Sequence, residues 1–217
     1  MSARQKTAKD VPHTRFDYII FDLGGVLVKY QRSPSILEYT ESPLTKDDLL
    51  WWWQRSSTVI QFEKGDISET EFAEKSINEL NLQVSIDSFL SWFTSSFKGL
   101  LPGVSKVILQ LSQTHRLATI SNINKVFWEK FEKTDIHACF SKHFLSFELG
   151  IRKPDPELYE IVLQTLAVPA HRLLYFDDLY ENIDTAKTLG IQSYVAKSVE
   201  DINKIAAEFE LLNSEKN

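Results

Sequence analysis

The stretch that decides the fold is Tyr18-Ile19-Ile20-Phe21-Asp22-Leu23-Gly24-Gly25-Val26-Leu27. Its apolar run predicts a buried strand, and the aspartate and the two glycines end that strand abruptly. In an open α/β sheet, ligands bind outside the carboxyl ends of the strands. Glycines at such a point let the backbone come close to an anion or a metal. Asp22 is therefore the first candidate for chemistry.

Further apolar segments predict a sheet around this first strand. They alternate with stretches whose apolar residues recur at three- and four-residue spacing, the period of an amphipathic helix. Strands that alternate with helices predict a Rossmann-like α/β fold, a parallel sheet sandwiched between helices. The expected strands lie at about 16–21, 116–120, 143–147, 172–176 and 192–195, and the expected helices at 104–111, 125–131, 157–166, 183–189 and 202–211.

The interval between Leu27 and Leu101 breaks this alternation, because it shows no convincing strand and several helical patterns. One helix is expected over 45–62, a second runs from a capping box at Ser68 and Glu71 to Leu80, and a third covers about 86–97. The pattern predicts a helical domain at 31–99, inserted into an α/β core at 16–30 and 100–217. Residues 1–15 are polar and mildly basic, and we expect a flexible tail there.

The composition narrows the class of partner. The chain has 217 residues, a net charge of -6 and a sequence pI near 5.4. This charge argues against nucleic acid or an anionic membrane, because both attract a positive surface. Cys139 is the single cysteine, so no intramolecular disulfide can form and a cytoplasmic setting is expected. We expect a monomer or homodimer that acts on a small molecule.

Polar side chains stand where the expected strands end. Because the carboxyl ends of parallel strands meet at one edge of the sheet, these side chains should converge. Carboxylates from separate strands suit Mg²⁺, serine and asparagine can hydrogen-bond to phosphate oxygens, and lysine adds a compact positive charge. An oxygen of Asp22 could then attack phosphorus and form an aspartyl-phosphate, which water would hydrolyse to release phosphate. The converging residues are Asp22, Ser121, Asn122, Lys153, Asp177 and Asp178.

Each of these features also has a purely structural interpretation. Ser121-Asn122 could cap the helix that starts near Asn124, and Asp177-Asp178 could face a helix N-terminus, where negative charge is favoured. Asp22-Leu23-Gly24-Gly25 could be only a strand end and a tight turn, and Lys153 could belong only to a stiff, proline-rich loop. These interpretations do not explain why every feature follows a strand, in this order.

Four segments together resemble the signature regions of the haloacid dehalogenase superfamily, and the resemblance runs from Phe16 to about Val195. The segments, in order, are Phe21-Asp22-Leu23-Gly24-Gly25-Val26-Leu27, Ile120-Ser121-Asn122, Gly150-Ile151-Arg152-Lys153-Pro154 and Phe176-Asp177-Asp178-Leu179-Tyr180-Glu181-Asn182-Ile183. The helical insert resembles the class I cap of the superfamily, which closes over the site. The fourth segment and Gly65-Asp66-Ile67-Ser68 resemble the branch of α-glucose-1-phosphate phosphatases and the phosphatase domain of soluble epoxide hydrolase.

The resemblance implies a Mg²⁺-dependent phosphatase that hydrolyses a small phosphomonoester, a sugar phosphate by likeness to this branch. Asp22 would be the nucleophile and a metal ligand, together with the Gly24 carbonyl and Asp178, with Asp177 alongside. Asn182 would support the site. The residues implied in phosphate binding are Ser121, Asn122, Lys153 and Gly25.

Gly24 departs from the pattern of the superfamily. Typical phosphatases of this kind carry a second aspartate there, which protonates the leaving oxygen. General acid–base assistance is worth about 10²–10⁴-fold in rate. We therefore expect a leaving group that needs little protonation, or another proton donor.

Two other functions stay open. A metal-independent haloacid dehalogenase on the same fold also uses an aspartate nucleophile, but it has no need for the paired carboxylates Asp177-Asp178. A catalytically weakened binding protein would fit Gly24 and the aromatic run Trp51-Trp52-Trp53, of which at least one side chain cannot face the same side of a helix as the others.

Overall fold

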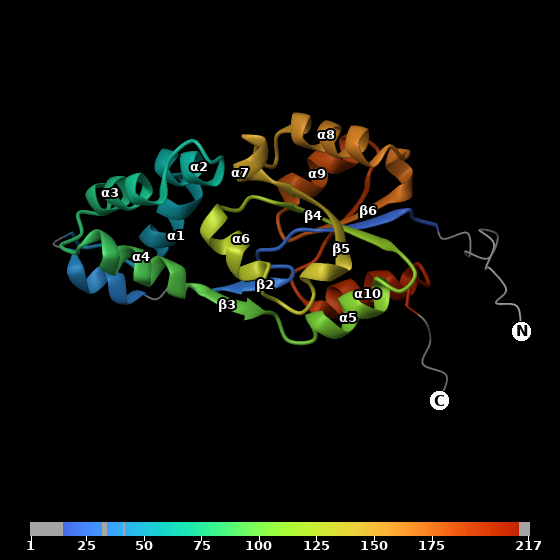
Figure 1. Ribbon diagram of the computed structural model, residues 1–217, viewed down its shortest axis with the longest axis horizontal. Helices are drawn as coiled ribbons and strands as arrows, with labels where there is room; N and C mark the ends of the chain where they lie inside the picture. The colour runs from blue at the N-terminus through green and yellow to red at the C-terminus, as the bar shows by residue number, and fades with distance from the viewer. Residues whose placement is uncertain (1–14, 32–33, 41, 213–217) are drawn as a thin grey trace, which may run out of the picture.

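The five expected strands form one parallel sheet in the order β5-β4-β1-β6-β7 (Figure 1). The structure is a computed structural model that describes residues 15–31, 34–40 and 42–212. Helices cover both faces of the sheet, which confirms the predicted α/β fold. The strands are β1 (Tyr18–Phe21), β4 (Arg116–Ser121), β5 (Phe140–Leu145), β6 (Leu173–Asp177) and β7 (Gln192–Val195).

The central strand β1 lies between β4 and β6. Phe21 is in register with Thr119 of β4 and with Phe176 of β6. The next residue, Asp22, therefore emerges between the carboxyl ends of both neighbouring strands. The backbone N–H of Asp22 still donates to the Phe176 carbonyl at 2.9 Å, which holds the nucleophile candidate at the sheet edge.

Alternate side chains of β1 enter two apolar layers, as the period of a strand requires. Tyr18 and Ile20 pack with α8 (Pro156–Leu166) and α9 (Tyr180–Thr188). Ile19 and Phe21 pack in the opposite layer, with α5 (Val104–Leu111) and α10 (Val199–Glu208). The remaining helical pieces of the core are α6 (Lys125–Phe131), α7 (Ser146–Leu149), η2 (His137–Cys139) and η3 (Ala170–Arg172).

Helices fill the interval 31–99 and gather at one end of the sheet (Figure 1). The expectation of a single helix over 45–62 is wrong, because the helix is interrupted at Ser56. Ser56 has extended backbone angles, and its hydroxyl accepts from the N–H groups of Thr58 and Val59 to start a new helix. The helices are η1 (Pro34–Tyr39), α1 (Lys46–Arg55), α2 (Ser57–Glu63), α3 (Glu69–Glu79) and α4 (Ile86–Ser95).

The expectation of no strand between Leu27 and Leu101 is also wrong. β2 (Val28–Tyr30) pairs with β3 (Phe97–Leu100) in an antiparallel ribbon. Both strands are too short to show a clear alternation, and Gly99 interrupts the pattern of the second. Through this ribbon, the chain enters and leaves the helical insert. The exact division at residues 31 and 99 stays a prediction.

The third long strand starts three residues earlier than expected, and Ser146 ends it. The hydroxyl of this buried serine accepts from the Ile123 N–H, and its single proton lies within hydrogen-bond distance of the carbonyls of Glu63 and Ile123. The serine thus ties the end of β5 to both β4 and the insert, and α7 begins where a strand was expected.

Aromatic packing joins the insert to the core. Phe62 stacks on Phe72 at 4.1 Å between ring centroids, and Phe93 stacks on Phe127 of α6 at 4.6 Å. The apolar core is therefore continuous from the sheet into the insert. Within the described ranges, the helices are too short or too polar to cross a membrane. The expected tail at 1–15 lies outside the described residues, apart from Arg15.

Candidate active site

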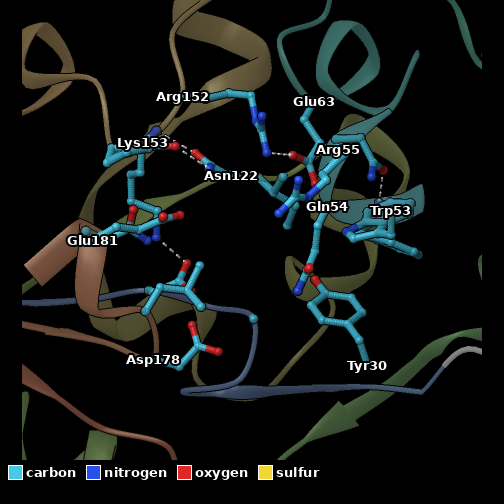
Figure 2. Close-up of a pocket in the computed structure, with 18 of the residues that line it drawn as sticks. Tyr30, Trp53, Gln54, Arg55, Glu63, Asn122, Arg152, Lys153, Asp178 and Glu181 are labelled. Carbon is cyan, nitrogen blue, oxygen red and sulfur yellow. Dashed lines mark hydrogen bonds and ion pairs between the residues drawn. The ribbon is translucent and has the colours of Figure 1, made fainter. Parts of the chain in front are cut away.

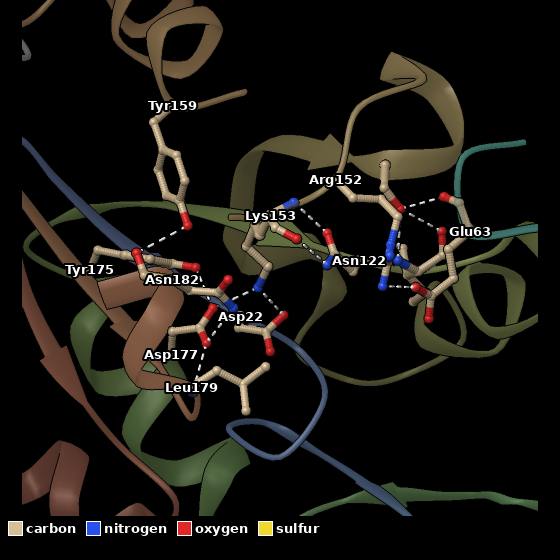
Figure 3. A network of polar contacts seen from close by, with 12 residues as sticks. Asp22, Glu63, Asn122, Arg152, Lys153, Tyr159, Tyr175, Asp177, Leu179 and Asn182 are labelled. Carbon is tan, nitrogen blue, oxygen red and sulfur yellow. Dashed lines mark hydrogen bonds and ion pairs between the residues drawn. The ribbon is translucent and has the colours of Figure 1, made fainter. Parts of the chain in front are cut away.

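Asp22 and Lys153 meet at the carboxyl edge of the sheet. Lys153 Nζ lies 2.9 Å from Asp22 Oδ1 and 2.6 Å from Asp177 Oδ2 (Figure 3). All three side chains are buried, with 4% of Lys153 and 7% of Asp22 exposed. The predicted convergence of the strand-end residues is thus realised by a lysine that bridges two carboxylates from neighbouring strands.

Asp177 is held by donors on both oxygens. Its Oδ2 accepts from Lys153 and from the Tyr175 hydroxyl. Its Oδ1 accepts from the Leu179 N–H at 2.9 Å and from Asn182 Nδ2 at 2.8 Å. These donors leave little room for a further ligand, so Asp177 is suited to fix Lys153. Asn182 thus contacts Asp177 directly, and its role in support of the reaction stays a prediction.

The pKa values follow from burial and charge. Burial raises the pKa of Asp22 to about 7, because the attraction of Lys153 only partly offsets desolvation and the repulsion of Asp177 and Asp178. Burial would lower the pKa of Lys153, but the two carboxylates outweigh it and raise that pKa. Burial likewise opposes ionisation of Asp177, yet Lys153 and the hydrogen bonds lower its pKa. The site therefore holds more negative charge than its lysine neutralises.

Asp178 lies at the opening of this cluster. Burial, and then the neighbouring Asp177, raise the pKa of Asp178. Asp22, Asp177 and Asp178 each offer an oxygen, and these oxygens lie within 4.8 Å of one another. A Cβ on Gly25 would come within 2.6 Å of Asp178 Oδ2, and the φ of Gly25 is +79°. Glycine at this position thus lets the Asp178 carboxylate approach the backbone.

Asn122 positions the loop that carries Lys153. Its Nδ2 donates to the Lys153 carbonyl at 2.9 Å, and its Oδ1 accepts from the Lys153 N–H at 2.8 Å. The side-chain amide therefore pairs with the backbone as a neighbouring strand would. Asn122 and Lys153 both line the cavity beside Asp22, whereas Ser121 and Gly25 do not line it. Direct phosphate contacts of Ser121, Asn122 and Gly25 stay predictions.

A cavity of about 660 Å³ lies between the sheet edge and the insert (Figure 2). Its floor contains Asp22, Lys153 and Asp178, and its roof comes from α1 and α2. The roof residues are Leu50, Trp53, Gln54, Arg55 and Glu63. A small organic molecule attached to a phosphate would thus contact both the core and the insert.

Arg152 and Glu63 were not among the expected site residues. They form an ion pair of 2.7 Å across the cavity, with 23% and 6% of their side chains exposed (Figures 2 and 3). Arg152 immediately precedes Lys153, so the loop that positions the lysine is also tied to α2. No sequence signal distinguishes Glu63 from the other acidic residues of the insert.

Tyr30 was missed as well. Its ring covers Gly24, because a Cβ built on this glycine would lie 3.1 Å from Tyr30 Cε2 and 3.4 Å from Cδ2. The ring packs against Phe127 at 4.9 Å and Phe97 at 5.8 Å between centroids. Tyr30 therefore fills the space above the position where the expected second aspartate is absent.

The run of three tryptophans splits among three environments. Trp51 is 60% exposed, and Trp52 is buried, with its Nε1 donating to Glu79 Oε2 at 2.6 Å. Trp53 stacks on Phe93 and lines the cavity. The run thus contributes one residue to the cavity, one to the interior of the insert and one to the surface.

A family profile described as Haloacid dehalogenase-like hydrolase matches residues 19–196. The chain belongs to this family. The matched range of this haloacid dehalogenase-like hydrolase contains Asp22, Asn122, Lys153, Asp177 and Asp178, which confirms the resemblance inferred from the sequence. Membership of the α-glucose-1-phosphate phosphatase branch stays a prediction.

Several relatives of this haloacid dehalogenase-like hydrolase carry phosphatase names. The D-ribitol-5-phosphate phosphatase of Bacteroides thetaiotaomicron is 25% identical over 188 residues, which cover 81% of this chain and 89% of that protein. The phosphorylated carbohydrates phosphatase of Thermotoga maritima is 26% identical over 190 residues, 80% of this chain and 82% of that protein. A haloacid dehalogenase family enzyme from B. thetaiotaomicron, crystallised with magnesium and inorganic phosphate, has the same fold, with a TM-score of 0.73 at 24% identity over 88% of this chain and 98% of that one.

Proposed function

We propose that the protein is a Mg²⁺-dependent phosphatase that hydrolyses a small phosphorylated carbohydrate through an aspartyl-phosphate on Asp22. The observation that carries this proposal is the cluster of Asp22, Asp177 and Asp178, in which Asp22 and Asp177 both pair with one buried lysine. A carboxylate nucleophile, a cation for phosphate and an excess of carboxylate oxygens are the groups that this reaction needs.

The residues fit a divalent metal ion. Oxygens from three carboxylates lie within 4.8 Å of one another, and hard oxygen donors suit Mg²⁺. Asp22, Asp178 and the Gly24 carbonyl would hold the ion. Asp177 already accepts from four donors, so its role is to hold Lys153 in place. When bound, Mg²⁺ supplies positive charge that keeps Asp22 ionised and offsets the charge of the phosphate.

The residues of the chain perform the rest of the reaction. Lys153 attracts the phosphate oxygens, and Asp177 fixes the ammonium group beside Asp22. An Asp22 oxygen attacks phosphorus, and the bond to the leaving oxygen breaks. Water then attacks the aspartyl-phosphate, which returns the Asp22 carboxylate and releases inorganic phosphate.

The cavity and the relatives favour a phosphorylated carbohydrate. Trp53 offers an aromatic face, and Gln54, Arg55 and the Arg152–Glu63 pair offer polar groups along the roof. A sugar or polyol presents both apolar and hydroxyl-bearing faces to such a surface. Two relatives are named for phosphorylated carbohydrates or a polyol phosphate.

Phosphate release tests the proposal. A panel of sugar, polyol, nucleotide and acyl phosphates should release phosphate with Mg²⁺ and stop releasing it with EDTA. Asp22→Asn should lower the rate by at least about 10³-fold, because an amide cannot serve as the nucleophile. Asp17→Asn is the matched control, since Asp17 precedes the same strand at the opposite end and pairs with Arg172. Unchanged activity in Asp22→Asn would rule out the mechanism.

A dehalogenase is the alternative enzyme. It would displace halide from a haloacid without metal and would need no oxygen cluster. Halide release that continues in EDTA, together with no phosphate release from the panel, would favour that function. Binding of phosphate esters without turnover would instead indicate a weakened binding protein.

A further inference from the structure

We propose that the Tyr30 hydroxyl donates the proton to the leaving oxygen, in place of the acid that Gly24 lacks. This inference rests on the proposed phosphatase function. Tyr30 lines the same cavity as Asp22, Gly24 and Asp178, and it reaches this place from the β2–β3 ribbon.

The ring is aligned with the missing side chain. The atom nearest to a Cβ at position 24 is Cε2, at 3.1 Å, and Cε2 is the ring carbon next to the one that bears the hydroxyl. Cδ2, farther from the hydroxyl, is also farther from that point, at 3.4 Å. The Cε2–Cδ2 edge of the Tyr30 ring therefore covers the position from which an acidic side chain would start, and the hydroxyl lies more than 4 Å from that position.

The hydroxyl also faces the appropriate side of the cavity. In-line displacement puts the leaving oxygen on the side of phosphorus opposite to the nucleophile. Asp22 is on the floor of the cavity, so the leaving oxygen faces the roof. Figure 2 shows the hydroxyl end of Tyr30 directed into the cavity toward Gln54 of α1. The phenol is thus placed between the floor and the roof.

The other cavity groups are less suited to this role. Arginine does not give up its proton in proteins, which excludes Arg55 and Arg152. Of the glutamates that line the cavity, Glu63 is engaged as the anion of an ion pair, and Glu181 is an exposed residue of the first turn of α9. Among the described residues that line the cavity, Tyr30 and Tyr180 carry hydroxyls, and Tyr180 is 68% exposed. Contacts with Phe127 and Phe97 hold the Tyr30 ring in place.

Tyr30 loses one proton and regains one proton in each turnover. As Asp22 attacks phosphorus, the bond to the alcohol oxygen breaks, and this oxygen takes the bond's electron pair and the phenolic proton. The products are the alcohol, the aspartyl-phosphate and the Tyr30 phenolate. Water next attacks phosphorus and gives its proton to the phenolate, while the electron pair of the broken bond returns to the Asp22 carboxylate. No oxidant or co-reactant is required.

Leaving-group dependence tests this role with Tyr30→Phe, which keeps the ring and removes the hydroxyl. The kcat/KM for a simple alkyl phosphate should fall by about 10²–10⁴-fold, because an alkoxide leaves poorly without a proton. The kcat/KM for p-nitrophenyl phosphate should change by less than about threefold, because p-nitrophenolate needs no proton. The kcat/KM covers the steps up to release of the alcohol, so it does not depend on the later hydrolysis of the aspartyl-phosphate.

Two further readouts separate catalysis from structure. Tyr30→Phe should give a pre-steady-state burst of p-nitrophenolate, because the base for the second step is also lost. Its affinity for inorganic phosphate, measured by calorimetry, should match that of the wild type. Tyr39→Phe is the matched control, because Tyr39 is an exposed tyrosine of η1 that does not line the cavity, and it should change neither ester by more than about threefold.

The outcomes discriminate between explanations. Equal losses on both esters, or no loss on either, overturn the role of Tyr30 while the wild type remains an Asp22-dependent phosphatase. A wild type that releases phosphate in Mg²⁺ neither from these esters nor from the panel of phosphates, or Asp22→Asn with full activity, overturns the proposed function and this inference with it. Selective loss on the alkyl ester together with the burst supports the proton donor.

Discussion

Arg152 and Glu63 form an ion pair of 2.7 Å that joins the loop of Lys153 to helix α2 of the insert. Both side chains are largely buried, so removal of one partner leaves the other as a poorly solvated charge that has lost this ion pair. Arg152→Met should lower the free energy of unfolding by about 3 kcal/mol in urea denaturation. Arg152→Met combined with Glu63→Gln should recover much of that loss. A single variant within about 0.5 kcal/mol of the wild type would show that the pair contributes little.

Magnesium should stabilise the fold without any substrate. A ligand that binds the folded state alone at 100 times its Kd contributes about 2.7 kcal/mol, and each kcal/mol raises the Tm of a chain of this size by about 2–4 °C. Scanning calorimetry with and without Mg²⁺ should show this rise. Asp178→Asn should abolish it, because it removes one of the clustered oxygens. An equal rise in that variant would place the ion elsewhere.

The two glycines after Asp22 should tolerate alanine differently. Gly25 has a φ of +79°, and a Cβ there would meet Asp178 Oδ2 at 2.6 Å. Gly25→Ala should therefore cost about 1–2 kcal/mol and weaken Mg²⁺ binding measured by calorimetry. Gly24 lies outside the left-handed region, and its Cβ would only press on the Tyr30 ring at 3.1 Å. Gly24→Ala should bind Mg²⁺ like the wild type.

Tyr175 should act through Lys153 without contacting the substrate. Its hydroxyl donates to Asp177 Oδ2, the oxygen that also holds Lys153. Tyr175→Phe should lower kcat by roughly 10- to 100-fold, since small displacements of a reacting group are costly. KM should change little. Tyr18→Phe, in the same apolar layer but at the amino end of β1, should leave kcat unchanged. Equal effects of both substitutions would indicate general destabilisation.

Acid should weaken the insert through Glu79. Burial opposes ionisation of this carboxylate, but hydrogen bonds from Thr58, Ser56 and Trp52 outweigh it and lower its pKa. Because the pKa of Glu79 is lower in the folded state, its ionisation stabilises the fold fully at pH values above the unfolded pKa of 4.5. This contribution to the free energy of unfolding is lost as the pH falls through the folded pKa. Allowing for solvent exposure, Glu79→Gln should cost about 1 kcal/mol at pH 6.5 and less at pH 4. Urea denaturation monitored by tryptophan fluorescence measures both, and an identical cost at the two pH values would contradict the prediction.

The strands and Asp22 could be predicted because their signals are local. An apolar run ending in Asp22 and two glycines shows a buried strand and its end without reference to any other segment. The alternation of strands and helices then fixes which ends converge. Asp178 is placed by the same reasoning, because it directly follows β6. Lys153 comes after β5 and the short helix α7, and it too returns to this edge of the sheet.

The features that were missed depend on contacts between distant segments. Tyr30 covers Gly24 only because β2 pairs with β3, and neither strand is long enough to show a period. Glu63 meets Arg152 through the packing of α2 on α7, which charge patterns do not encode. The break at Ser56 was missed because the apolar spacing continues across it, and only the cap geometry reveals two helices.

The β2–β3 ribbon is the place where the helical insert could be separated from the core. Tyr30 and Phe97 are register partners, and the Gln31 N–H donates to the Ser96 carbonyl at 2.8 Å. The chain therefore departs from the core and comes back to it at neighbouring points. A tight hairpin turn between Gln31 and Ser96 would close the ribbon. Such a shortened protein would keep the sheet with Asp22, Lys153 and Asp178 but would have an open, roofless cavity, and a different roof could be grafted at the same two residues.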